Sequence, residues 1–517
     1  MKKSFLLLLC LLFLPLLVAC TGNETQIDPE STAEPAPSET EAVQDTAQTE
    51  ADTSQQPETL SIACSTKGYN PYLTTDTLVA QTASLLFENF IDISPDFAID
   101  YRLAESVECS GTTVTITLRA GCYFADGTPI STDDALYSLQ AAMASDTYRA
   151  RFSNVLSVSA TETTLVLTLA TPDSMFAYLL DIPILKADDV ASTSPTASGR
   201  YTYGADGTTL VKNHFTRFPS DGDDTIHLVL VANYDDMISA LALGQTNYTV
   251  QGEGSTSSSS ISTTEHYYKT NTLLFLGVNS YAANPLCNTA EGRNLLSALI
   301  DRDALAIDTY DARAYAARGA LNSFYPAATD TQSILSTSDD STLAQTMLTL
   351  GYTYNDESGF YQDENGTNAQ ISILIHTGNT YKTLLASELS EKWAKYGIET
   401  TIITASDFNS FLTLLESNEF ELYIGEMKLY NNIELSSFWE GSAKHGIQAS
   451  ETLLSSYAAF RADASQAAAF EAAFAAEMPY IPLLWKNGVV LTSRNASGVS
   501  ASISNQFYAF GDLTFSN

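Results

Sequence analysis

Apolar and polar residues alternate in parts of this chain. Residues 114–118 read Val-Thr-Ile-Thr-Leu, and residues 165–169 form a second run rich in β-forming residues. A period of two places one face of a strand on a core and the other face toward solvent. We therefore predict a β-strand at each of these two positions.

Helical spacing appears in other segments. Residues 131–134 offer N-cap candidates, and Ala135, Leu136, Leu139 and Ala142 follow at helical spacing. Further helices are predicted through 295–300 and 384–393, with strand-like segments at 398–403 and 421–424, and the serine tract 255–260 is predicted to be a loop. The mixture of helices and strands predicts an α/β fold with several sheets.

The N-terminal residues indicate where the protein works. Lys2 and Lys3 precede an apolar run at 5–14, and residues 17–20 read Leu-Val-Ala-Cys. This is the form of a secretory signal, and the run is shorter than the roughly 20 residues of a membrane span. Leu-Val-Ala-Cys also resembles the lipobox of bacterial lipoproteins, which implies that Cys20 is lipidated and becomes the mature N-terminus. An ordinary secretory signal is the alternative.

The segment behind Cys20 is polar. Residues 21–58 consist mainly of Glu, Thr, Ala, Pro, Ser, Asp and Gln. Such a composition buries too little apolar surface to offset its ordering entropy, so we predict a disordered tether. We expect a protein of the cell envelope that works outside the cytoplasm while lipidated Cys20 holds it to the membrane.

The charge balance excludes two classes of partner. Lys and Arg total 24 against 61 Asp and Glu, which gives a formal net charge of −37. A chain this acidic is unsuited to binding nucleic acid or to adsorbing on anionic lipid. The expected membrane contact is therefore the lipid anchor alone.

Candidate chemistry is sparse. Cys109 and Cys122 flank a predicted strand, and both a disulfide and two free thiols fit an oxidising compartment. The sequence has no C-x-x-C pair and no His/Cys cluster with zinc spacing, and its five histidines lie far apart. Nucleophile-elbow, zincin, P-loop and dinucleotide-binding motifs are also missing from it. We therefore predict no metal site, no cofactor and no enzymatic activity.

Nine segments, in order along the chain, resemble the peptide/nickel-type family of bacterial extracellular solute-binding proteins, family 5. The most diagnostic is Phe-Ala-Asp-Gly-Thr-Pro-Ile-Ser-Thr-Asp-Asp-Ala at 124–135, which is similar to the family pattern F-x-D-G-x-P-(V/I)-T-A-x-D-V. The other matching segments are 70–73, 86–90, 103–106, 114–121, 198–201, 298–302, 396–398 and 479–483. These residues mainly shape turns and strand entries.

The resemblance implies a two-lobed periplasmic-binding-protein fold with an extra small domain inserted in lobe one. Lobe one would comprise 59–85, 181–267 and 489–517, the inserted domain 86–180, and lobe two 268–488. Proteins of this type close around a ligand by hinge motion.

The resemblance also implies candidate ligand residues. Relatives hold a peptide backbone in the cleft and place an aspartate for its α-amino group in lobe two. That position falls here on Tyr430 or Asn431, so Glu426 or Glu434 is the candidate for the missing negative charge, and Lys428 is a candidate to face an anionic group. The remaining cleft candidates are Thr75, Asp76, Thr77, Gln251 and Phe408.

The predicted function is therefore capture of a small, peptide-like ligand by a monomeric lipoprotein and its delivery to the permease subunits of an ABC-type importer. Two alternatives stay open, a sensory or signalling binding protein and an envelope hydrolase. The sequence does not choose among a peptide, a sugar, a metal chelate and a signalling peptide as cargo.

Overall fold

The computed structural model describes residues 59–64, 69–74, 77–217, 223–252, 263–279, 281–311, 313–328, 339–439 and 448–516. Cys20, the predicted tether up to residue 58 and the serine tract 255–260 lie outside these residues.

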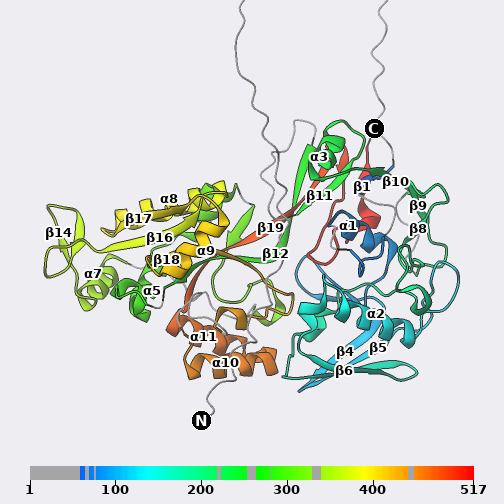
Figure 1. Cartoon of the computed structure of the whole chain (residues 1–517), viewed down its shortest axis with the longest axis horizontal. Coiled ribbons are helices and arrows are strands. Elements are labelled where there is room, and N and C mark those ends of the chain that lie inside the picture. Colours follow the sequence, from blue (N-terminus) through cyan, green and yellow to red (C-terminus); the bar gives the residue numbers. More distant parts are fainter. Residues whose placement is uncertain are drawn as a thin grey trace, which may run out of the picture. The chain divides into compact units, whose positions relative to one another are not determined.

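One large mixed sheet runs through the described chain in the order β17-β16-β18-β12-β19-β11-β1-β10-β9-β8, with β13 also paired to β19 (Figure 1). Its strands are β1 (Ser61–Cys64), β8 (Tyr201–Tyr203), β9 (Thr209–Lys212), β10 (Thr225–Leu230), β11 (Tyr248–Gly252), β12 (Thr263–Val278), β13 (Ala314–Ala316), β16 (Gln370–His376), β17 (Glu399–Ala405), β18 (Leu422–Lys428) and β19 (Tyr480–Ser493). The strands predicted at 398–403 and 421–424 are confirmed as β17 and β18.

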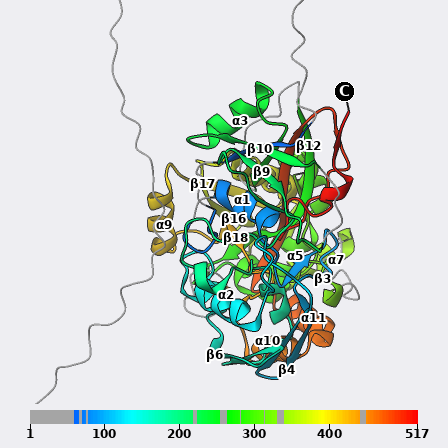
Figure 2. The same cartoon turned by 90° about the vertical axis from the view of Figure 1, so that its right-hand side faces the viewer.

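Helices pack on both faces of this sheet. In α8 (Thr380–Lys395) the buried residues Leu385, Leu389 and Trp393 follow the predicted helical spacing. Figure 2 shows α9 (Phe408–Ser417) at one flank of β16, β17 and β18. The other helices of this part are α1 (Thr77–Leu86), α3 (Tyr234–Ala242), α4 (Pro285–Asn288), α5 (Ala290–Ala298), α6 (Arg302–Tyr310), α7 (Asp340–Thr349), α10 (Glu451–Ala462) and α11 (Ala467–Glu477).

Residues 104–169 contribute a second sheet of four antiparallel strands, in the order β4-β5-β7-β6. Its β5 and β7 confirm the two strands predicted from alternation, and α2 (Thr132–Ala144) confirms the helix between them, with a capping box made by Ser131 and Asp134. The strands are β4 (Ala104–Ser110), β5 (Thr113–Leu118), β6 (Val155–Ala160) and β7 (Thr164–Leu169). This segment lies where an inserted domain is expected.

Three short two-stranded sheets complete the fold. They pair β2 (Ile91–Ile93) with β3 (Ile99–Tyr101), β14 (Thr353–Asn355) with β15 (Phe360–Gln362), and β20 (Ala496–Ser497) with β21 (Thr514–Phe515). None of the four cysteines of the described residues, Cys64, Cys109, Cys122 and Cys287, takes part in a disulfide.

The expected lobe boundaries fall within the two longest strands. Tyr267 pairs with Val489 and Tyr268 with Gly488, so the antiparallel ladder of β12 and β19 continues across both boundaries (Figure 1). The register then shifts between Lys269 and Leu273. An irregularity of this kind bends a strand locally, which suits a connection between two lobes.

Candidate functional site

Five of the predicted ligand residues gather at one edge of the large sheet. β16 pairs in parallel with both β17 and β18, so the carboxyl ends of these strands, at His376, Ala405 and Lys428, share that edge. Open α/β sheets bind ligands outside the carboxyl ends of their strands. The predicted residues found there are Phe408, Glu426, Lys428, Tyr430 and Asn431. We refer to the segments 376–382, 405–408 and 426–431 as the strand-end edge.

The sheet separates these residues into two groups. Glu426 contacts Lys382 of α8, whereas Tyr423 of the same strand contacts Phe411 of α9. Because side chains alternate along a strand, Glu426 lies on the face that carries α8, and Lys428, two residues further on, lies on that face too. Phe408, at the start of α9, belongs to the other face.

The carboxylate of Glu426 is held by two lysines. Its Oε1 lies 2.8 Å from Nζ of Lys486, and its Oε2 lies 3.1 Å from Nζ of Lys382. Burial alone would raise the pKa of Glu426, but the two ammonium groups outweigh burial and hold that pKa below its ordinary value. The carboxylate is therefore ionised and already compensated within the protein.

A second ion pair lies beside this cluster. Arg313 Nη2 lies 2.7 Å from Oε1 of Glu265, and Tyr267 donates its hydroxyl proton to the same carboxylate. Arg313 Nη1 also donates to the hydroxyl of Tyr381, which neighbours Lys382, at 3.3 Å. The sequence predicted neither the pair of Arg313 and Glu265 nor the two lysines that contact Glu426. These side chains come together through the order of the strands in the sheet, which no local pattern indicates.

Asn431 joins the strand-end edge to the segment that precedes β8. Its Nδ2 donates to Oδ2 of Asp181 at 3.0 Å, and its Oδ1 accepts from Nδ2 of Asn271 at 3.2 Å. Asp181 also contacts Arg151 at 2.6 Å, yet burial keeps the pKa of this carboxyl raised despite the guanidinium. The amide of Asn431 is thus engaged by protein groups on both sides, whereas Tyr430 leaves 40% of its surface exposed.

Glu434, the second candidate carboxylate, belongs to an internal network. It accepts a hydrogen bond from the hydroxyl of Tyr457 at 2.7 Å and lies 3.6 Å from Nη2 of Arg461. Burial would raise the pKa of Glu434, but Arg461 and these hydrogen bonds lower it. Its contacts serve the packing of α10 against the segment that follows β18.

The structure gives few contacts for the candidate ligand residues of the expected lobe one, which are Thr75, Asp76, Thr77 and Gln251. Gln251 is buried on β11. Thr77 is the first residue of α1, and Thr75 and Asp76 lie outside the described residues.

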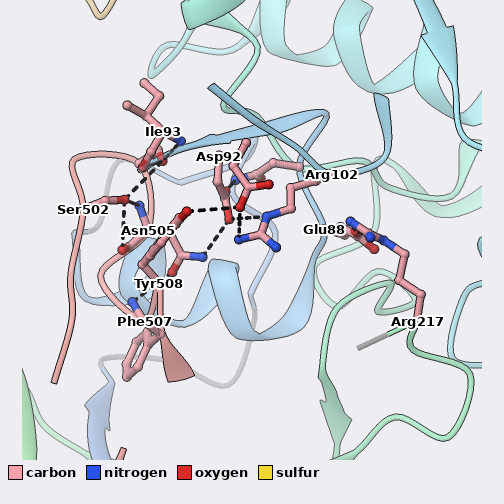
Figure 3. A network of polar contacts seen from close by, with 12 residues as sticks. Glu88, Asp92, Ile93, Arg102, Arg217, Ser502, Asn505, Phe507 and Tyr508 are labelled. Carbon is pink, nitrogen blue, oxygen red and sulfur yellow. Dashed lines mark hydrogen bonds and ion pairs between the residues drawn. The ribbon is translucent and has the colours of Figure 1, made fainter. Parts of the chain in front are cut away.

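A small polar cavity, to which the strand-end edge contributes no residue, is lined by residues from 84–92, by Arg102, Gly199 and Arg200, and by Asn505. Figure 3 shows the polar contacts of its wall. Arg102 on its wall contacts Asp92 at 3.0 Å and Asp100 at 2.9 Å, and Asn505 donates to Asp92 at 3.0 Å. Glu88 contacts Arg217, and burial raises the pKa of Glu88 in spite of that cation. The charged groups of the cavity wall are therefore paired with one another. We interpret these contacts as structural, because they attach the C-terminal segment to the rest of the protein through Asn505 and Asp92.

Within the described ranges, no group of His, Cys, Asp and Glu side chains is arranged to hold a metal ion. The helices of the same ranges include none long and apolar enough to cross a bilayer.

Solved structures match almost the whole of this fold. They include a nickel ABC transporter protein from Bacillus halodurans (16% identity, TM-score 0.71) and an ABC transporter substrate-binding protein from Sinorhizobium meliloti (15%, 0.70). A putative peptide binding protein from Clostridium difficile matches with 17% identity and a TM-score of 0.64. Each alignment covers 89% of this chain and 100% of the other. The two-lobed fold expected from the resemblance is thereby confirmed.

The search of curated proteins found no match. The family model of the bacterial extracellular solute-binding proteins, family 5, matches residues 98–432, which is more than half of the chain. The chain therefore belongs to this family, whose members are binding proteins that work outside the cytoplasm and not enzymes.

Proposed function

We propose that this protein captures a small, peptide-like ligand between its lobes at the strand-end edge and delivers it to the permease of an ABC-type importer. The observation that carries the proposal is the contact between Asn431 and Asp181, which brings the chain just after β18 against the segment that follows β7. A ligand held at this edge would lie between groups from distant parts of the chain. The leader at 1–20 supports anchoring through Cys20.

Two features favour a peptide-like ligand. Tyr267, which donates to Glu265, and Tyr430, two residues after Lys428, are 44% and 40% exposed, and such rings offer a large apolar contact area. One structural neighbour is a putative peptide binding protein. Another is a nickel ABC transporter protein, so a metal chelate is the competing cargo.

Mass spectrometry of ligand retained through native purification tests the proposal directly. We expect peptide-like masses, and re-addition of those compounds should raise the melting temperature. Tyr430→Ala should reduce that rise, whereas Tyr354→Ala, an exposed tyrosine on β14, should not. Retention of a sugar or a metal chelate in place of peptide would overturn the ligand class.

A further inference from the structure

The charge arrangement around Glu426 points to the chemistry of the ligand. Two ammonium groups, those of Lys382 and Lys486, share this single carboxylate, one on each oxygen. The neighbouring Arg313 is matched by Glu265. The cluster around Glu426 therefore carries an excess of positive charge inside a chain whose formal net charge is −37.

The position of Lys382 strengthens this observation. It lies in the first turn of α8, a helix capped by Asn379. The amino end of a helix carries a partial positive charge and favours anions, so a lysine is electrostatically unfavourable there. The same partial charge adds to the positive potential that an incoming group would meet.

The cluster is partly withdrawn from water but remains open. Side-chain exposure is 8% for Lys486, 17% for Lys382 and 26% for Glu426, and Lys428 on the same face is exposed. Solvent therefore screens an anion at this position less than it would on an open surface. Each ammonium has three N–H donors, of which Glu426 takes one.

We infer that the ligand presents a carboxylate to Lys382 and Lys486, with Lys428 at the outer side of the same face. The carboxylate would accept the remaining ammonium donors and restore local neutrality through charge-assisted hydrogen bonds. This inference rests on the proposed function, because it assigns one end of the ligand that the strand-end edge would hold.

Four forms of one alanine tetrapeptide test it by isothermal titration: N-terminus free or acetylated, combined with C-terminus free or amidated. Amidation should weaken binding by about 10- to 100-fold, the loss expected for a charge-assisted contact, and acetylation should have a smaller effect. A fifth peptide, amidated but with glutamate as its last residue, distinguishes a terminal carboxylate from a side-chain one.

Lys382→Gln should reduce the preference for the free carboxylate to less than about threefold. Lys395→Gln, an exposed lysine in the last turn of the same helix, is the matched control and should keep the preference. A thermal melt of each variant verifies folding. Equal affinity for acid and amide forms would overturn the carboxylate inference but leave peptide capture intact. Failure of all five peptides to bind would overturn the peptide class and this inference with it.

Discussion

Asp173 and Arg461 form a buried ion pair in which Oδ2 of Asp173 lies 2.5 Å from Nη2 of Arg461. Their side chains are 1% and 9% exposed, so both charges are almost completely withdrawn from water. Asn432 donates to the same carboxylate oxygen at 2.7 Å, and Arg461 donates to the main-chain oxygen of Asn432. The segment after β7, the last strand of the four-stranded sheet, is thereby bound both to α10 and to the residues that follow β18.

Arg461→Ala should destabilise the protein strongly. The variant leaves Asp173 buried and without its cation, and breaking a buried pair in this way costs about 3–5 kcal/mol. Urea denaturation measures the loss. Arg149→Ala provides the control, because its pair with Asp146 is exposed and worth less than about 1 kcal/mol. Similar losses in both variants would contradict the role assigned to burial.

Glu471 predicts a particular dependence of stability on pH. It is fully buried and accepts hydrogen bonds from the main-chain N–H groups of Ala320 and Leu321, at 3.0 and 2.7 Å. Burial outweighs these bonds and raises the pKa of Glu471 from 4.5 to about 7. Between these two values the folded state binds the proton more tightly than the unfolded state, so the free energy of unfolding falls as pH rises from about 4.5 to 7.

The Glu471→Gln variant should lose this part of the pH dependence. The shift corresponds to about 3 kcal/mol, so the wild type should lose about that much more stability than the variant between pH 4.5 and pH 8. Urea titrations of both proteins across this range provide the measurement. If the stability of the two proteins changed with pH in parallel, the pKa of Glu471 would not be raised in the folded state and the prediction would be wrong.

Local patterns predicted the elements well, and their mutual placement poorly. Strand β5 and helix α2 follow from alternation and from the Ser131 cap, which are properties of a few adjacent residues. The cluster around Glu426 depends instead on the sheet order β18-β12-β19, which brings Lys486 beside a strand 60 residues earlier in the chain. The order of these strands in the sheet cannot be predicted from the periodicity of apolar residues along the sequence.

The candidate site shows the same limit. Phe408 and Glu426 were both assigned to the cleft by resemblance, and they do share the strand-end edge, but the contact of Phe408 with His376 and the register of β16 and β18 place the two side chains on opposite faces of the sheet. Asn431 could be assigned to the right edge of the sheet, yet its contact with Asp181 joins residues 250 positions apart. Such a contact becomes visible only when the chain is folded.

The contact between Asn431 and Asp181 leads to a prediction about motion. If it forms when the lobes close, saturating ligand should stabilise it and reduce the radius of gyration measured by small-angle scattering. Asn431→Ala should shift the ligand-free protein toward the larger value. An unchanged radius with a demonstrated tight ligand would contradict closure.

Anchoring can be tested independently of the ligand. Cys20→Ala should release the folded protein from membranes, because no acyl chain could then be attached at the lipobox. Detergent phase separation of wild type and variant measures this, and Cys10→Ala is the matched control. A variant that still partitions with the detergent phase would show that Cys20 is not the anchor.

Glu426→Gln distinguishes two roles for this carboxylate. If Glu426 accepted the ligand's ammonium, the variant would lose any preference for a free N-terminus over an acetylated one. We expect no such loss, since both oxygens of Glu426 are already held by Lys382 and Lys486.

Removing the carboxylate of Glu426 frees the two ammonium groups for the ligand. Affinity for a peptide with a free C-terminal carboxylate should therefore rise, by up to about tenfold for one charge-assisted contact. The gain should shrink moderately as salt concentration rises, because the cluster stays partly open to solvent and salt screens a charge contact there. Glu391→Gln, an exposed position on α8, should change neither affinity nor its salt dependence. A variant that binds acid and amide peptides no better than the wild type, but no longer distinguishes free from acetylated N-termini, would assign Glu426 to the ligand's amine instead.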